Sequence, residues 1–129
     1  MSDDLLESFK ARYSFALDPF QIDAIRAIQD EKSVIVSAPT GSGKTLVAEF
    51  AIHATLARRC RIAYTTPLKA LSNQKYADFC RQFGSDHVGI LTGDVKVNAR
   101  AAVVVMTTEI LRNMFYTGGL DGLEFVVLD

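Results

Sequence analysis

The residues with the clearest chemistry form a glycine-rich stretch at positions 38–45. In order they are Ala38, Pro39, Thr40, Gly41, Ser42, Gly43, Lys44 and Thr45. The two glycines allow a tight bend in which consecutive backbone N–H groups can face a polyphosphate at the N-terminus of a following helix. Lys44 would then bind the β- and γ-phosphates, and the Thr45 hydroxyl would bind a bridging Mg2+. The stretch therefore predicts a site for a nucleoside triphosphate with magnesium.

The flanking residues support this interpretation. An apolar run at 34–36 predicts a strand before the stretch, and an amphipathic run at 46–52 predicts a helix after it. The usual pattern begins with glycine, whereas this chain has Ala38, so the looser form with a small first residue applies. A chance Gly/Ser-rich turn that happens to carry a lysine is the alternative, and the strand and helix around it argue against that reading.

Gln21 lies near the start of another predicted helix, with Asp18 as the N-cap and Pro19 at the first helical position. Its amide can reach back to the N–H of the cap residue and close a capping box. It can equally meet the N6 and N7 edge of adenine, because an amide offers a donor and an acceptor together. Spacing alone leaves both interpretations open.

Apolar runs at 34–36, 61–66, 88–91, 102–106 and 125–128 alternate with helical patterns. This alternation predicts an α/β fold in which a parallel sheet has helices on both faces. Polar motifs follow the strands, including Thr66-Pro67, Thr92-Gly93 and Thr107-Thr108, so we expect them at one edge of the sheet. Thr66 is predicted to cap a helix that begins at Pro67. Hydroxyls and free N–H groups at helix starts suit a phosphodiester as well as they suit capping.

Composition limits the class of protein. The chain has 129 residues, of which 49% are hydrophobic and 22% charged, and a net charge of −1, so it is one globular domain whose nucleic-acid contacts must come from locally placed groups. Its two cysteines lack metal-ligand spacing, its acidic N-terminus does not look like a secretion signal, and no apolar run reaches the length of a membrane span. We expect a cytoplasmic or otherwise intracellular domain without a membrane partner.

Taken together, the motifs resemble those of superfamily-two DExH-box RNA helicases of the superkiller type. The resemblance covers residues 15–129 and follows the family's order of motifs. The matching segments are 15–21 (Q-motif region), 38–45 (motif I), 66–75 (TPLKALSNQK, motif Ia), 91–95 (LTGDV), 106–112 (MTTEILR) and 126–129 (VVLD, the opening of motif II). Motif I alone indicates a nucleoside triphosphatase, whereas the segments at 66–75 and 106–112 are much more specific.

The resemblance implies a P-loop, RecA-like first motor domain at 15–129, preceded by a lead-in at 1–14. It assigns adenine recognition to Gln21, catalytic roles to Lys44, Thr45 and Asp129, and Mg2+ binding to Thr45 and, through water, Asp129. Contacts to an RNA backbone would come from Thr66, Pro67, Lys69, Thr92, Gly93, Thr108 and Arg112. Arg112 can instead pair with an acidic neighbour. In the family a glutamate, later motifs and a second RecA-like domain follow, so we expect a sheet that is incomplete at its C-terminus and a segment that does not turn over ATP by itself.

The function implied for the parent protein is ATP-dependent unwinding of RNA, or translocation along single-stranded RNA. A DNA helicase or translocase is an alternative, because motifs of this kind hold a backbone that both polymers share. A non-catalytic, nucleotide-gated module that binds nucleic acid is another. A small-molecule kinase explains neither the 66–75 segment nor the 107–112 segment.

Overall fold

The computed structural model describes residue 11 and residues 19–29, 44–118 and 123–128. The chain divides into two compact units, Met1–Ala57 and Arg58–Asp129, and each is described by itself. Residues 34–36 and 38–43 and Asp129, which carry the first predicted strand, most of motif I and the start of motif II, lie outside the described residues.

The first unit contains helix α2 (Pro19–Gln29) and most of helix α3 (Lys44–Arg58). Helix α2 begins at Pro19, as the sequence predicts, because proline needs no hydrogen-bond acceptor at the first helical position. Helix α3 begins at Lys44, and its apolar residues Phe50 and Ile52 are fully buried. The helix predicted after the glycine-rich stretch is therefore present.

The second unit is built on a five-stranded sheet. Its strands are β1 (Arg61–Thr66), β2 (Val88–Leu91), β3 (Lys96–Val97), β4 (Val103–Thr107) and β5 (Leu123–Leu128), in the spatial order β3-β2-β4-β1-β5. The pairs β2–β4, β4–β1 and β1–β5 are parallel, which confirms the predicted parallel sheet. Strand β3 was not predicted, and it pairs with β2 in the antiparallel direction, so the sheet is mixed.

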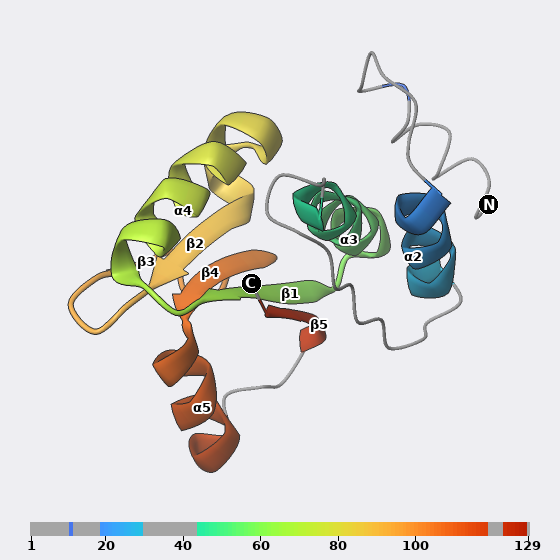
Figure 1. Cartoon of the computed structure of the whole chain (residues 1–129). Coiled ribbons are helices and arrows are strands. Elements are labelled where there is room, and N and C mark those ends of the chain that lie inside the picture. Colours follow the sequence, from blue (N-terminus) through green and yellow to red (C-terminus); the bar gives the residue numbers. More distant parts are fainter. Residues whose placement is uncertain (1–10, 12–18, 30–43, 119–122, 129) are drawn as a thin grey trace. The chain divides into compact units, whose positions relative to one another are not determined.

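Helices cover both faces of this sheet, as predicted. Helix α4 (Lys69–Phe83) packs on β1, β2 and β4 from one side, and helix α5 (Thr108–Thr117) packs on β4 and β1 from the other (Figure 1). A short 3-10 helix, η1 (Ser85–His87), joins α4 to β2. Strands β1 and β4 are buried because helices α4 and α5 pack on their opposite faces, which explains their largely apolar sequences.

Alternate residues of β1 and β4 face opposite helices. On the α4 face, Tyr64 meets Phe79 edge to face with 5.0 Å between ring centroids. Val105, which lies beside Tyr64 in the register, belongs to the same face. On the α5 face, the buried cluster consists of Ala63, Val104, Met106 and Leu111. These two apolar layers hold the strands in place, and therefore fix the positions of the residues at their carboxyl ends.

The predicted start of α4 is wrong by two residues. The helix begins at Lys69, and its N-cap position is Leu68, which makes no side-chain capping bond. Thr66 does not cap the helix, because its hydroxyl donates to the Leu68 carbonyl oxygen at 2.8 Å and is 2.9 Å from the Ser72 hydroxyl. Residues 67 and 68 therefore form a short connection that carries the chain from the sheet edge into the helix.

Candidate nucleic-acid interface

The carboxyl ends of β1, β2 and β4 lie at one edge of the sheet, and most of the residues predicted to contact a nucleic-acid backbone lie there. Thr66 ends β1, Thr92 follows β2 directly, and Thr108 follows β4 as the first residue of α5. Parallel pairing puts Thr66 beside Thr107 and Leu91 beside Met106. The predicted grouping of these motifs at one edge is therefore correct for the described strands.

Thr66 and Thr108 are linked directly. The Thr108 hydroxyl donates to the Thr66 carbonyl oxygen at 3.2 Å. Thr66 is fully buried and its hydroxyl is engaged with Leu68 and Ser72, whereas Thr108 is exposed. Thr66 thus orders the backbone where β1 meets α4. Thr108 is accessible to a ligand.

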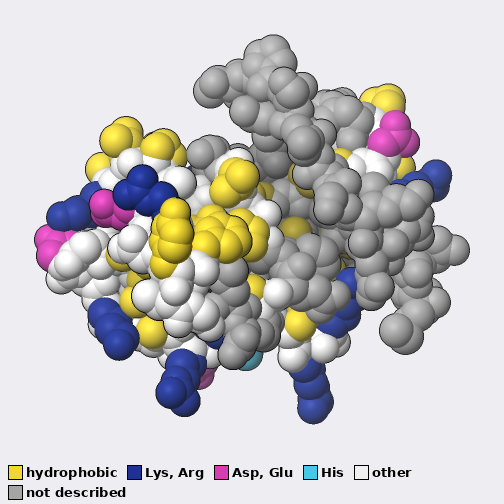
Figure 2. Space-filling model, turned by 90° about the horizontal axis from the view of Figure 1, so that it is seen from below, with side chains coloured by type: hydrophobic (Ala, Val, Ile, Leu, Met, Phe, Trp, Pro, Cys, Tyr) yellow, Lys and Arg dark blue, Asp and Glu magenta, His cyan; other side chains and the backbone are white. Residues whose placement is uncertain are grey.

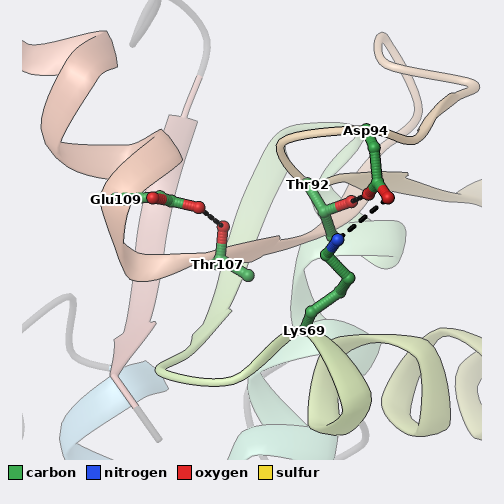
Figure 3. Close-up of polar contacts among 5 residues, drawn as sticks. All are labelled: Lys69, Thr92, Asp94, Thr107 and Glu109. Carbon is green, nitrogen blue, oxygen red and sulfur yellow. Dashed lines mark hydrogen bonds and ion pairs between the residues drawn. The ribbon is translucent and has the colours of Figure 1, made fainter.

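Lys69 and Thr92 both bind the carboxylate of Asp94 (Figure 3). The Lys69 ammonium is 2.9 Å from Asp94 Oδ2, and the Thr92 hydroxyl donates to Asp94 Oδ1 at 3.1 Å. Both interactions lower the pKa of Asp94 from its ordinary value, and the bond to Lys69 has the larger effect. Asp94 is therefore a fixed anion between two residues that were predicted to contact phosphates.

A second carboxylate lies on the same edge. The Thr107 hydroxyl is 3.4 Å from Glu109 Oε1, and that oxygen would be 4.0 Å from a Cβ atom at Gly93 (Figure 3). Gly93 is exposed and has open space around it. The turn after β2 and the start of α5 therefore lie close together, so one strand of nucleic acid can meet both.

Pro67, which follows Thr66 directly, and Arg112, in the second turn of α5, are exposed. Among the residues that the structure describes, no hydrogen bond or ion pair joins Arg112 to the other predicted contacts or to an acidic neighbour. The described lysine and arginine side chains are scattered over the face seen in Figure 2 and do not form one dense patch. This agrees with the expectation from the net charge of −1 that any grip on a polyanion is local.

The predicted nucleotide-binding residues lie in the first unit. Gln21 is buried, with 3% of its surface exposed, in the first turn of α2. Lys44 and Thr45 are the first two residues of α3, which agrees with a phosphate site at a helix N-terminus, and their side chains lie outside the described part. Ala38, Pro39, Thr40, Gly41, Ser42, Gly43 and Asp129 also lie outside the described residues. The roles of all these residues stay predictions.

The magnesium prediction is chemically consistent, because a threonine hydroxyl and a carboxylate are oxygen ligands of the kind that Mg2+ prefers. Within the described ranges, no group of three histidine, cysteine, aspartate or glutamate side chains could hold a metal ion. None of the helices described there is long and apolar enough to span a membrane. Cys60 and Cys80 are not joined in a disulfide.

Three residues of this edge were not predicted from the sequence as part of the site. Ser72 is fully buried and shares a hydrogen bond with Thr66, while Asp94 and Glu109 provide the two carboxylates. A signal for Asp94 was present, because an acidic residue in a Thr-Gly-Asp turn at a strand end can bind the threonine hydroxyl. No pattern pointed to Ser72, whose burial depends on contact with a neighbouring strand end.

The mostly parallel sheet and the order of the strand-end motifs are those of a helicase domain. Residues 18–129 match the DEAD/DEAH box helicase family, so this chain belongs to that family. The resemblance found from the motifs is confirmed, and the described sheet is consistent with part of a RecA-like α/β domain.

The chain is similar to several much longer helicases. It is 53% identical over 126 residues to the "Probable helicase HelY" of Mycobacterium tuberculosis, covering 96% of this chain and 14% of the relative. It is 53% identical over 119 residues to the "ATP-dependent RNA helicase mtr4" of Schizosaccharomyces pombe, covering 91% of this chain and 10% of the relative. It is 43% identical over 129 residues to the "Antiviral helicase SKI2" of Saccharomyces cerevisiae, covering 98% of this chain and 10% of the relative. The chain therefore spans a seventh or less of the length of these relatives.

Proposed function

We propose that this chain supplies the ATP-binding site and part of the RNA-binding surface of an ATP-dependent RNA helicase. Lys44 and Thr45 would bind the phosphates and magnesium, Gln21 would read adenine, and Asp129 would hold magnesium through water. Bound Mg2+ would neutralise charge on the phosphates during hydrolysis. We further propose that the whole protein contains a second RecA-like domain and is located inside the cell.

The observation that carries this proposal is the shared edge formed by the ends of β1, β2 and β4. Thr108 is bonded to the end of β1, and Lys69 at the start of α4 is bonded to the turn after β2. Hydroxyls, backbone N–H groups and a lysine at one edge suit successive phosphates of a single strand, which a translocating motor holds without reading bases. Three connections of the fold would move together along such a strand.

RNA is the proposed substrate because one of the similar proteins is named an RNA helicase and shares 53% of the aligned residues. Contacts to the sugar-phosphate backbone alone do not separate RNA from DNA, since the 2′-hydroxyl is the group that distinguishes them. The substrate must therefore be tested directly against a matched DNA strand.

The test is ATP hydrolysis by the full-length protein that carries this sequence, alone, with single-stranded RNA and with single-stranded DNA of the same sequence. We expect RNA to raise the rate and Lys44→Ala to abolish it. Lys96→Ala is the matched control, because it makes the same substitution on the exposed strand β3 and should leave the rate unchanged.

Each other outcome revises a stated part of the proposal. Equal stimulation by RNA and DNA would replace the RNA helicase with a general nucleic-acid motor. An absence of hydrolysis with either polymer would leave a nucleotide-gated binding module and refute the motor. Full activity in Lys44→Ala would refute the assignment of the nucleotide site.

A further inference from the structure

The ion pair between Lys69 and Asp94 occupies the lysine that is proposed to meet a phosphate. The Lys69 ammonium lies 2.9 Å from Asp94 Oδ2, and the first turn of α4, where Lys69 stands, contains no acidic residue of its own. Asp94 comes instead from the turn after β2 (Figure 3). We propose that Asp94 competes with the nucleic-acid phosphate for Lys69 and thereby sets how tightly this surface holds a strand. This inference rests on the function proposed above.

The competition follows from the hydrogen-bonding chemistry of the carboxylate. An ionised carboxylate and a phosphodiester both accept hydrogen bonds and are both negatively charged. Asp94 uses one oxygen for Lys69 and the other for the Thr92 hydroxyl, so it already takes two donors that were assigned to the backbone of the strand. A phosphate that approaches Lys69 must displace this carboxylate or accept repulsion from it.

Asp94 is held in place by more than Lys69. The Thr92 N–H donates to the Val95 carbonyl oxygen at 2.9 Å, which closes the turn around Asp94, and the Thr92 hydroxyl holds Asp94 Oδ1. The carboxylate therefore stays near the lysine when a phosphate arrives. An asparagine at this position keeps an oxygen for the Thr92 hydroxyl but loses the negative charge.

The pair is exposed enough for a phosphate to reach the Lys69 ammonium and compete with Asp94 for it. The side chain of Lys69 is 53% exposed and that of Asp94 is 63% exposed. Exposed ion pairs change an equilibrium constant by a factor of roughly one to five, so Asp94 weakens binding without preventing it. A motor has to release each phosphate as it advances, and a competing carboxylate beside the binding lysine favours that release.

The chain offers a matched control on the same helix. Asp78 pairs with Arg81 on the surface of α4, so Asp78→Asn removes one negative charge and frees one cation, as Asp94→Asn does. A general effect of net charge would appear in both variants. An effect on the strand-binding edge would appear only in Asp94→Asn.

The experiment measures the Kd of the full-length protein for fluorescent single-stranded RNA over a range of salt concentrations. We expect Asp94→Asn to tighten binding roughly two- to fivefold at low salt. The slope of log Kd against log salt concentration should also become steeper, by the equivalent of about one released counterion. The reason is that Lys69 becomes fully available to phosphate. Lys69→Ala should weaken binding. In the Lys69→Ala background, Asp94→Asn should have no more effect than Asp78→Asn has.

Two results separate the inference from the function on which it rests. If Lys69→Ala weakens binding but Asp94→Asn leaves the Kd and the salt slope unchanged, or weakens binding, the competition is refuted and the interface stands. If the protein binds no nucleic acid, both are refuted. If it binds RNA but Lys69→Ala has no effect, the competition is refuted, and the proposed function is still decided by the ATP hydrolysis test. Thermal unfolding checks that the variants are folded, and Asp94→Ser provides the same test should Asp94→Asn be unstable.

Discussion

The Thr108 hydroxyl donates a hydrogen bond of 3.2 Å to the carbonyl oxygen of Thr66 and so joins the first turn of α5 to the end of β1. Helices α4 and α5 lie on opposite faces of the sheet (Figure 1). The bond lies at the edge where the backbone leaves β1 toward α4 and leaves β4 toward α5. The two strand-end motifs are therefore held at a fixed spacing by the fold itself. At this edge Thr66 is buried and orders the backbone, whereas Thr108 is exposed to solvent.

Thr66→Val should destabilise the protein by about 1–2 kcal/mol. Valine keeps the shape of threonine, but the buried Ser72 hydroxyl loses the Thr66 hydroxyl as its partner. The Leu68 carbonyl oxygen loses one of its two donors and keeps the Ser72 N–H at 3.1 Å. Urea unfolding measures the loss. Thr117→Val is the control, because the Thr117 hydroxyl bonds the Asn113 carbonyl oxygen on the exposed surface of α5 and should matter little. Equal midpoints for the two variants would contradict this view of Thr66.

Gly89→Ala should destabilise the fold by about 2 kcal/mol or more, because overpacking against backbone cannot relax. A Cβ atom on Gly89 would overlap the Asn98 carbonyl oxygen and lie 2.8 Å from that of Val97. Gly93→Ala makes the same change where the nearest atom is 4.0 Å away, and it should leave stability within about 0.5 kcal/mol. Thermal unfolding of both variants checks the difference, and an unaffected Gly89→Ala would show that the β2–β3 connection can move.

Phe79→Leu should cost about 1–2 kcal/mol, because it removes a buried ring that packs edge to face on Tyr64. Phe115→Leu removes a ring from α5 that is 63% exposed, and its effect should be within about 0.5 kcal/mol. Denaturant unfolding compares the two variants. A larger loss at Phe115 would mean that this ring is covered by something other than solvent.

Lys69→Met should raise the pKa of Asp94 toward its ordinary value, because Lys69 is the main cause of the lowering. A pKa that is lowered on folding adds stability above the unfolded-state value of about 4, and this contribution is lost as the pH falls through the lower folded value. Carboxyl carbon shifts followed by NMR measure the titration. Lys96→Met is the control. An unchanged midpoint in Lys69→Met would show that the Thr92 hydroxyl alone determines the shift.

The sequence predicted the four parallel strands of the second unit because each is a continuous apolar run followed by a polar turn. It did not predict β3, since two residues, Lys96 and Val97, are too few to show a period. Its antiparallel pairing is fixed by contacts with β2 that only the folded chain brings together. The existence of the four longer strands could thus be predicted from local sequence, whereas the edge strand β3 could not.

The same distinction explains the start of α4. Thr66-Pro67 has the local features of a helix start, but Thr66 is drawn into the core, where its hydroxyl bonds Ser72. Leu71 is 37% exposed, whereas the adjacent polar residue Ser72 is fully buried. For the site, the grouping of the strand-end threonines at one edge could be predicted from their position after apolar runs, whereas Lys69 was assigned only through the family resemblance. The bond between Thr92 and Asp94 lies within one turn and had a local signal, whereas the pairing of Asp94 with Lys69 depends on two segments that only the fold brings together.

The short strand β3 also bears on how copies of the protein behave in concentrated solution. It offers two residues to a neighbouring chain, one of them the exposed Lys96, and the backbone then turns away at Asn98, whose φ is 49°. The Asn98 amide binds the carbonyl oxygens of Asp86 and Val88, which holds this turn against the start of β2. A charged, brief and bent edge is a poor template for intermolecular strand pairing. This margin of the sheet is therefore protected against the edge-to-edge aggregation to which parallel sheets are prone.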